Sequence, residues 1–181
     1  MTLIIFVVIQ NFVAQPYKVQ QQSMERTLEP EQYVLVDKLT PRFNPYKRGD
    51  IVVFTPPAAW GDNGTPFIKR VIGEAGDTVQ IRDDGLVYIN DVALDEPYLY
   101  SDEVGGPAQA TTATLDQATW TIAPNEVFLM GDHRSNSADS RTFGPVQIDH
   151  IIGRAWLRYW PLDTFGVLPT PTYPDIVPAA P

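Results

Sequence analysis

The chain has 181 residues, enough for one large domain or for a core that carries an insertion. Thirteen Lys and Arg against 22 Asp and Glu give a net charge of −9 without a basic stripe, so nucleic acid is not expected as a partner. The absence of cysteine excludes disulfides, thiolate metal sites and cysteine nucleophiles, and a metal site or serine–histidine pair would have to use His133 and His150. No metal and no cofactor are expected.

The first segment is strongly apolar, since residues 3–14 read LIIFVVIQNFVA. As a helix it would be about 18 Å long, whereas the hydrocarbon core of a bilayer is about 30 Å thick. It could form a buried helix, an interfacial segment, or the last part of a spanning helix, and Pro16 ends any helix just before it. A secretory signal peptide is not favoured, because no basic segment precedes it and no small-residue cleavage site follows.

From residue 17 onward the pattern is typical of short strands joined by turns. Segments rich in β-branched residues and bounded by Gly, Pro or Asn predict strands over 33–39, 50–54, 67–72, 78–82, 86–90, 126–130 and 150–160. Residues 91–125 are acidic and weakly periodic, which indicates an inserted lobe or mobile loops. The six prolines of 161–181 predict an extended tail on the surface. The predicted fold class is mostly β, a coiled or barrel-like sheet with a short hydrophobic N-terminal helix.

Three segments carry side chains suited to catalysis. Residues 131–144 read GDHRSNSADSRTFG, which is either a solvated turn or an interior site in which Asp and Arg pair. Lys69 lies centrally in an apolar strand, where it is either a desolvated base or a lysine that protects a sheet edge. Ser23 follows three glutamines and is either a loop residue or a nucleophile, in which case Lys69 is the available base.

Four segments together resemble the type I signal peptidases, the membrane-anchored serine–lysine proteases of bacteria. They are residues 22–28 (QSMERTL), 48–54 (RGDIVVF), 67–77 (FIKRVIGEAGD) and 131–141 (GDHRSNSADSR), and their order and spacing agree with that family across residues 14–160. The resemblance implies that 1–14 belong to a membrane anchor, 15–82 and 126–160 to a catalytic β core, 83–125 to a smaller inserted lobe, and 161–181 to a Pro-rich tail.

The resemblance also implies roles for individual residues. Ser23 would attack the scissile carbonyl, and Lys69 would act as general base and then protonate the leaving amine. Ser137 would orient the Lys69 amine. Two supporting ion pairs are implied, Asp139 with Arg141 and Asp132 with Arg70. The apolar pockets that accept small residues at −1 and −3 of an Ala-x-Ala site would be shaped by Val19, Met24, Leu28, Phe67 and Ile68.

The chain departs from the family pattern near the nucleophile. Gln20 and Gln21 stand where proline and serine are common, so the amide of Gln21 would replace a serine hydroxyl in the oxyanion hole, or that donor is missing. Loss of one such donor typically costs about 100- to 1,000-fold in rate. Arg26 replaces a proline, which is expected to loosen the turn, and His133 replaces an asparagine and is interpreted as structural.

The implied partners are preproteins that carry signal peptides and membrane lipid, with the secretion machinery as a further candidate. The implied location is the bacterial cell membrane, with one spanning segment and the catalytic domain on the extracytoplasmic face. Two alternatives remain. A self-cleaving serine–lysine regulator would need a DNA-binding domain and a linker, which the apolar segment before Ser23 does not offer. A catalytically impaired membrane-surface relative would explain Gln20 and Gln21 but not the retention of Ser23 and Lys69.

Overall fold

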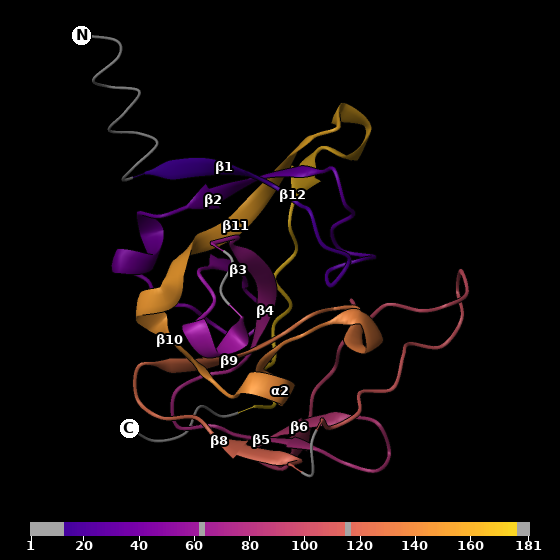
Figure 1. Ribbon diagram of the computed structural model, residues 1–181. Coiled ribbons are helices and arrows are strands. Elements are labelled where there is room, and N and C mark those ends of the chain that lie inside the picture. Colours follow the sequence, from indigo (N-terminus) through magenta and orange to yellow (C-terminus); the bar gives the residue numbers. More distant parts are fainter. Residues whose placement is uncertain (1–12, 62–63, 115–116, 177–181) are drawn as a thin grey trace, which may run out of the picture.

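Two antiparallel sheets make up most of the computed structural model, which describes residues 13–61, 64–114 and 117–176 (Figure 1). The larger sheet has eight strands in the order β1-β2-β11-β3-β4-β9-β10, with β12 paired to β11. These strands are β1 (Ala14–Lys18), β2 (Tyr33–Asp37), β3 (Ile51–Phe54), β4 (Phe67–Gly73), β9 (Glu126–Met130), β10 (Val146–Gln147), β11 (Ile151–Trp160) and β12 (Gly166–Val167).

The smaller sheet has four strands in the order β7-β6-β5-β8. They are β5 (Thr78–Ile81), β6 (Val87–Ile89), β7 (Val92–Ala93) and β8 (Thr119–Thr121). The short helices are η1 (Thr40–Arg42), η2 (Ala58–Trp60), η3 (Arg134–Asn136), α2 (Ser140–Phe143), η4 (Ile148–His150) and η5 (Leu162–Thr164). The sequence division placed residues 78–82 with the core, whereas β5 pairs within the smaller sheet.

All seven predicted strands are present, as β2, β3, β4, β5, β6, β9 and β11. The remaining five strands were not predicted and are short. One of them, β1, begins at Ala14, the last residue of the predicted anchor, and pairs with β2. The predicted N-terminal helix otherwise falls on residues outside the described part of the chain. Within the described ranges, no helix has the length and apolarity needed to cross a membrane.

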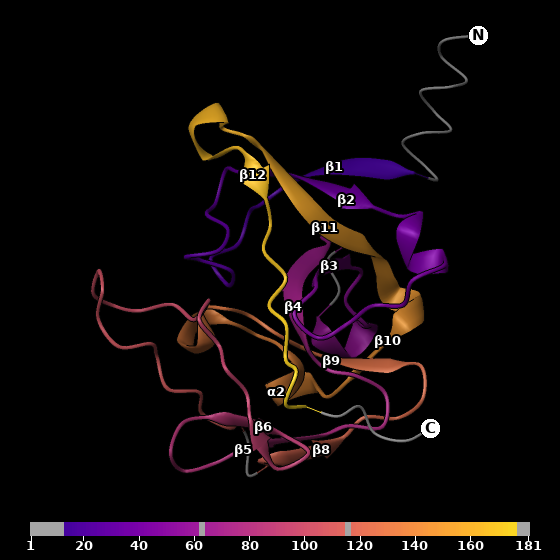
Figure 2. The same cartoon turned by 180° about the vertical axis from the view of Figure 1, so that it is seen from behind.

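The larger sheet is strongly curled, which confirms the mostly β, coiled-sheet fold class (Figures 1 and 2). Its longest strand, β11, pairs with β2 on one side and β3 on the other. The register shifts along both pairings, between Ala155 and Leu157 and between Ile151 and Gly153 among others. Such bulges bend a strand and increase its twist, so they let β11 wrap the sheet around its interior.

Three apolar clusters stabilise this arrangement. Because side chains alternate along a strand, Ile51 and Val53 of β3 enter one cluster while Val52 and Phe54 enter another on the opposite face. The third cluster joins the two sheets, since Phe128 of β9 packs in it together with residues of β5, β6 and β8. The smaller sheet therefore packs against one face of β4 and β9.

The C-terminal segment does not lie only on the surface, as its prolines predicted. Figure 2 shows the chain running from β12 toward the smaller sheet. Leu168 is buried in the cluster around β2 and β3, and Ile176 is buried in the cluster between the two sheets. Proline content sets the extended backbone, but isolated apolar side chains of an extended segment still pack wherever they meet apolar surface.

Candidate functional site

The strand β4 and the turn between β1 and β2 bring Lys69 and Ser23 into contact. Lys69 Nζ donates to Ser23 Oγ over 2.6 Å and to the carbonyl of Ile68 over 3.2 Å. Both residues are buried, with Lys69 1% and Ser23 4% exposed. Lys69 pairs with Val52 of the neighbouring strand β3, so it stands inside the sheet and not at an edge.

The surroundings of Lys69 favour its neutral amine. Burial lowers the pKa of Lys69 to about 8, because the ammonium loses its hydration. The negative charges of Asp139 and Asp132 partly oppose this shift, and the positive charge of Arg141 reinforces it. A neutral amine in hydrogen-bond contact with a serine hydroxyl can accept its proton.

The turn that carries Ser23 is fixed by local hydrogen bonds and by its own core side chains. The N–H groups of Thr27 and Leu28 both donate to the carbonyl of Met24, and the Met24 and Leu28 side chains are fully buried. Arg26 has φ +77°, which proline cannot adopt because its ring holds φ near about −65°. The turn therefore takes a conformation at Arg26 that excludes proline, and the expectation that Arg26 loosens it stays a prediction.

The segment 131–141 closes around the same turn. The His133 N–H donates to the Ser23 carbonyl over 3.0 Å. An ideal Cβ built on Gly131 would stand 2.5 Å from that carbonyl oxygen and 2.7 Å from Ser137 Cβ. Only glycine fits between the turn that carries Ser23 and Ser137, and this role of Gly131 was not predicted from the sequence.

Asp139 and Arg141 form a buried ion pair beside the turn. Arg141 donates to Asp139 from Nε over 2.8 Å and from Nη2 over 2.9 Å. Burial alone would raise the pKa of Asp139. The positive charge and hydrogen bonds of Arg141 act in the opposite direction, as do hydrogen bonds from Ser137 and Gly131, and together they lower the pKa of Asp139 below its usual value. Asp139 thus stays ionised and holds the surrounding loop in place.

Ser137 has a different partner from the one implied by the resemblance. Its hydroxyl donates to Asp139 over 2.7 Å. The hydrogen bonds of Lys69 Nζ within the described residues go to Ser23 and Ile68, so the Ser137 hydroxyl makes no hydrogen bond to the amine. Its expected role in orienting Lys69 stays a prediction.

A second buried pair, Arg70 with Asp132, joins β4 to the turn that carries Ser23. Arg70 donates to Asp132 over 2.9 Å from Nε and 2.7 Å from Nη2, and the Thr27 hydroxyl donates to the same carboxylate over 2.5 Å. The guanidinium also stands 3.9 Å from the ring centroid of Tyr98. Because Thr27 follows Ser23 by four residues, this pair helps to position the serine.

A third buried ion pair, Arg134 with Glu96, was not predicted from the sequence. Arg134 is fully buried and donates to Glu96 of the lobe segment, over 3.0 Å from Nη1. It also donates to Thr111 and, over 3.0 Å, to the carbonyl of Gly131. Glu96 is one of several acidic residues in the lobe segment 83–125, and no local sequence pattern distinguishes it from the others. The pair ties the lobe to the segment that closes the site.

His133 and Glu25 make a contact at the outer side of the turn. His133 Nδ1 lies 2.6 Å from a Glu25 carboxylate oxygen, and its ring stacks on Tyr100 with centroids 3.9 Å apart. These contacts agree with the structural interpretation of His133. In the described part of the chain, no group of three or more metal-ligating side chains is placed to hold an ion.

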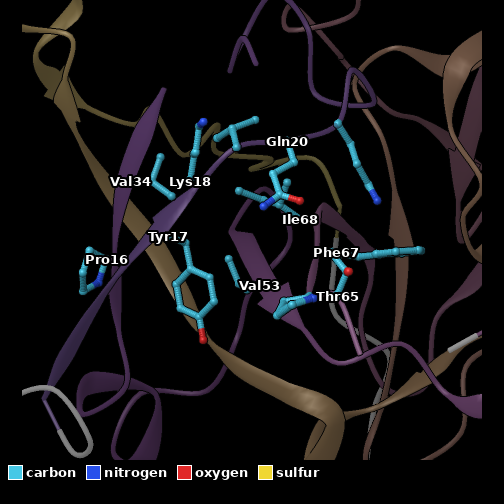
Figure 3. A pocket seen from close by; sticks show the side chains of 12 residues that line it. Pro16, Tyr17, Lys18, Gln20, Val34, Val53, Thr65, Phe67 and Ile68 are labelled. Carbon is cyan, nitrogen blue, oxygen red and sulfur yellow. The ribbon is translucent and has the colours of Figure 1, made fainter. Parts of the chain in front are cut away.

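Two pockets that share lining residues lie in this region, and one of them contains Ser23. One, of about 470 Å³, is lined by Ser23, Lys69 and Asn136 among others. The other, of about 150 Å³, is mainly apolar and receives side chains from β1, β2, β3 and β4 (Figure 3). Val19 and Ile68 line the smaller pocket, whereas Phe67 and Gln21 line both. Met24 and Leu28, expected to shape the pockets, belong instead to the core beneath them.

Comparisons with known proteins show which family the sequence matches. A family model described as signal peptidase, peptidase S26, matches residues 1–160. Signal peptidase I of Leptolyngbya laminosa is 38% identical over 172 residues, which cover 91% of this chain and 78% of that protein. Signal peptidase I of Bacillus caldolyticus is 36% identical over 159 residues, 86% of this chain and 84% of that protein. A crystal structure of a signal peptidase I from Enterococcus faecalis V583 is 33% identical with a TM-score of 0.45, covering 61% of this chain and 97% of that chain.

Proposed function

Because the chain belongs to the signal peptidase family, peptidase S26, and is a peptidase that removes signal peptides, we propose that Ser23 is its nucleophile and Lys69 its general base. The observation that carries this proposal is the 2.6 Å contact between Ser23 Oγ and Lys69 Nζ in a buried site. The lowered pKa of Lys69, about 8, supports it, because a neutral amine is needed to accept the serine proton.

The reaction follows from these two groups. The neutral Lys69 amine accepts the proton of Ser23 as Oγ attacks the scissile carbonyl, and the carbonyl oxygen becomes an oxyanion. Lys69 then gives that proton to the leaving nitrogen as the C–N bond breaks and the acyl-enzyme forms. A water molecule, deprotonated by Lys69, attacks the ester and restores Ser23.

The oxyanion needs donors at the nucleophile turn. The Ser23 backbone N–H supplies one, and we assign the second to the side-chain amide of Gln21, which lines the same pockets. In Gln21→Ala the second donor is lost, so kcat is expected to fall about 100-fold. Unchanged kcat in that variant would remove Gln21 from the oxyanion hole.

The buried pairs position this machinery. Asp139 with Arg141 holds the loop of residues 131–141, and Asp132 with Arg70 holds the turn that carries Ser23, while the Ser137 hydroxyl donates to Asp139. The larger sheet forms the catalytic core in this proposal, and the four-stranded sheet with its loops forms the smaller lobe.

The pockets fit a substrate with small residues before the scissile bond. The acyl side of the substrate would occupy the groove lined by Gln21 and Phe67, with a small −1 side chain beside Ser23. The −3 side chain would enter the smaller apolar pocket lined by Val19 and Ile68. Cleavage would therefore follow an Ala-x-Ala pattern in preproteins.

The proposal is tested by cleavage of a preprotein with an Ala-x-Ala site, in detergent or lipid. Wild type is expected to cleave after the −1 alanine, while Ser23→Ala and Lys69→Ala lose activity. Cleavage that survives in Lys69→Ala would overturn the mechanism but keep the protease. A folded wild type that cleaves nothing would instead favour a catalytically impaired relative.

Membrane contact forms a further part of the proposal. The apolar residues that precede β1 would anchor the chain with its catalytic domain on the extracytoplasmic face of a bacterial membrane, where the secretion machinery delivers preproteins. The exposed Trp160 and Phe165, at 50% and 61%, support this location, because they lie on the β11–β12 hairpin at the same end of the molecule as β1 (Figures 1 and 2). Replacement of both by serine should reduce binding to lipid vesicles without changing cleavage of soluble peptides.

A further inference from the structure

Two exposed amide side chains, those of Gln22 and Asn136, form one wall of the pocket that contains Ser23 and Lys69. Asn136 Nδ2 donates to Gln22 Oε1 over 3.1 Å. Gln22 directly precedes the nucleophile, and Asn136 is the last residue of η3. The bond therefore bridges two segments that lie 114 residues apart in the chain.

The position of this bridge indicates which part of a substrate meets it. Gln20, Gln21 and Phe67 line both pockets, so the groove continues from Ser23 toward the smaller apolar pocket on that side. The residues before the scissile bond are proposed to lie there. A chain that passes Ser23 must then leave over Asn136, so the first residues of the mature protein face the amide bridge.

The bridge is held in fixed relation to the serine. The His133 N–H donates to the Ser23 carbonyl over 3.0 Å, and the Asn136 N–H donates to the His133 carbonyl over 3.0 Å. On the other side, the Glu25 N–H donates to the Gln22 carbonyl over 3.1 Å. Groups fixed in this way contribute binding free energy without first losing conformational freedom.

The bridge offers hydrogen-bonding groups that suit a peptide main chain. Each side-chain amide has one carbonyl oxygen and one NH2 group. The bond between them uses Gln22 Oε1 and Asn136 Nδ2. Gln22 Nε2 and Asn136 Oδ1 have no hydrogen-bond partner among the described residues, which leaves one donor and one acceptor for the N–H and C=O of a passing chain.

We propose that Gln22 and Asn136 form the leaving-side subsite, which binds the main chain of the first residues of the mature protein beyond the scissile bond. This inference rests on the proposed function. Recognition through main-chain groups is independent of side-chain identity, so it suits a peptidase whose products begin with different residues. It also holds the leaving nitrogen near Lys69 while that nitrogen is protonated.

The test compares two soluble substrates with the same Ala-x-Ala acyl part. In the first, an aminocoumarin amide follows the −1 alanine, so no peptide occupies the leaving side. In the second, five residues follow it. The variants are Gln22→Ala, Asn136→Ala and the double variant. Gln147→Ala serves as the matched control, because it removes another exposed amide, which donates to Glu126 over 2.7 Å on the β9–β10 pair.

Each single variant is expected to lower kcat/KM on the extended peptide about fivefold, the value of one hydrogen bond, and to leave the aminocoumarin substrate unchanged. An equal loss of kcat/KM on both substrates, or no loss of kcat/KM on the extended peptide, would overturn the assignment of the leaving-side subsite. Thermal unfolding of each variant separates lost binding from lost folding. If wild type cleaves neither substrate, the proposed function fails, whereas wild-type cleavage with no substrate-dependent difference defeats only this inference.

Discussion

Replacing Gly131 by alanine tests whether the close approach of segment 131–141 fixes the position of the nucleophile. The added Cβ would stand 2.5 Å from the Ser23 carbonyl oxygen and 2.7 Å from Ser137 Cβ. The Ser23 carbonyl belongs to the backbone, so it cannot rotate away from the added Cβ as a flexible side chain can. An ordinary contact begins near 3.4 Å, so the carbonyl and Gly131 must separate by about 0.9 Å.

The displacement acts directly on the reacting groups. Ser23 Oγ lies only 2.6 Å from Lys69 Nζ, and Ser23 shares its backbone with the displaced carbonyl. Misplacement of a reacting group by about 1 Å can lower the rate about 100-fold. Overpacking of this kind costs about 1–3 kcal/mol of stability, so the variant is expected to fold but to lose about 100-fold in kcat.

The assay is cleavage of a soluble Ala-x-Ala peptide, with thermal unfolding measured in parallel. Gly166→Ala is the matched control, because no atom lies within 4 Å of the Cβ that it would add. The control should keep wild-type kcat. A Gly131→Ala enzyme with kcat within threefold of wild type would refute the reasoning, since the nucleophile would then tolerate the displaced backbone.

The remaining predictions concern charge and burial. Because the pKa of Lys69 is lowered to about 8, kcat/KM on a soluble peptide should rise with pH through about 8, and a flat profile from pH 6 to 9 would contradict the dyad. Between about pH 8 and the unfolded pKa of about 10.4, Lys69 is protonated in the unfolded chain but neutral in the folded one. The free energy of unfolding therefore rises with pH across this window, and below it the burial of the ammonium destabilises the fold in full. Lys69→Met should therefore be more stable than wild type at pH 7, by about 3 kcal/mol in urea unfolding, with a smaller difference near pH 10. Arg70→Leu should cost about 3–5 kcal/mol because the charge of the buried Asp132 carboxylate loses its cationic partner, and the double variant with Asp132→Leu should cost less.

Local sequence patterns were sufficient for seven of the strands and for naming candidate residues of the site. β-branched residues between turn formers predicted seven strands, because strand propensity and turn chemistry are properties of a few adjacent residues. The resemblance in four segments added the candidate residues, among them Ser23, Lys69 and Asp139. Short edge strands such as β7 and β10, each two residues long, carry too little pattern to be recognised.

Contacts between distant segments required the folded chain. Met24 and Leu28 resemble pocket residues in sequence, but the folded chain places them in the core, and Leu168 is buried although it lies at the start of a proline-rich segment. The partner of Ser137, the glycine contact at Ser23 and the bridge between Gln22 and Asn136 depend on how β4, β9 and the nucleophile turn meet. Local patterns specify which face of a strand is apolar, whereas the surface that this face packs against follows from long-range pairing. The candidate catalytic segments could therefore be named from the sequence, and their geometry was decided by the tertiary structure.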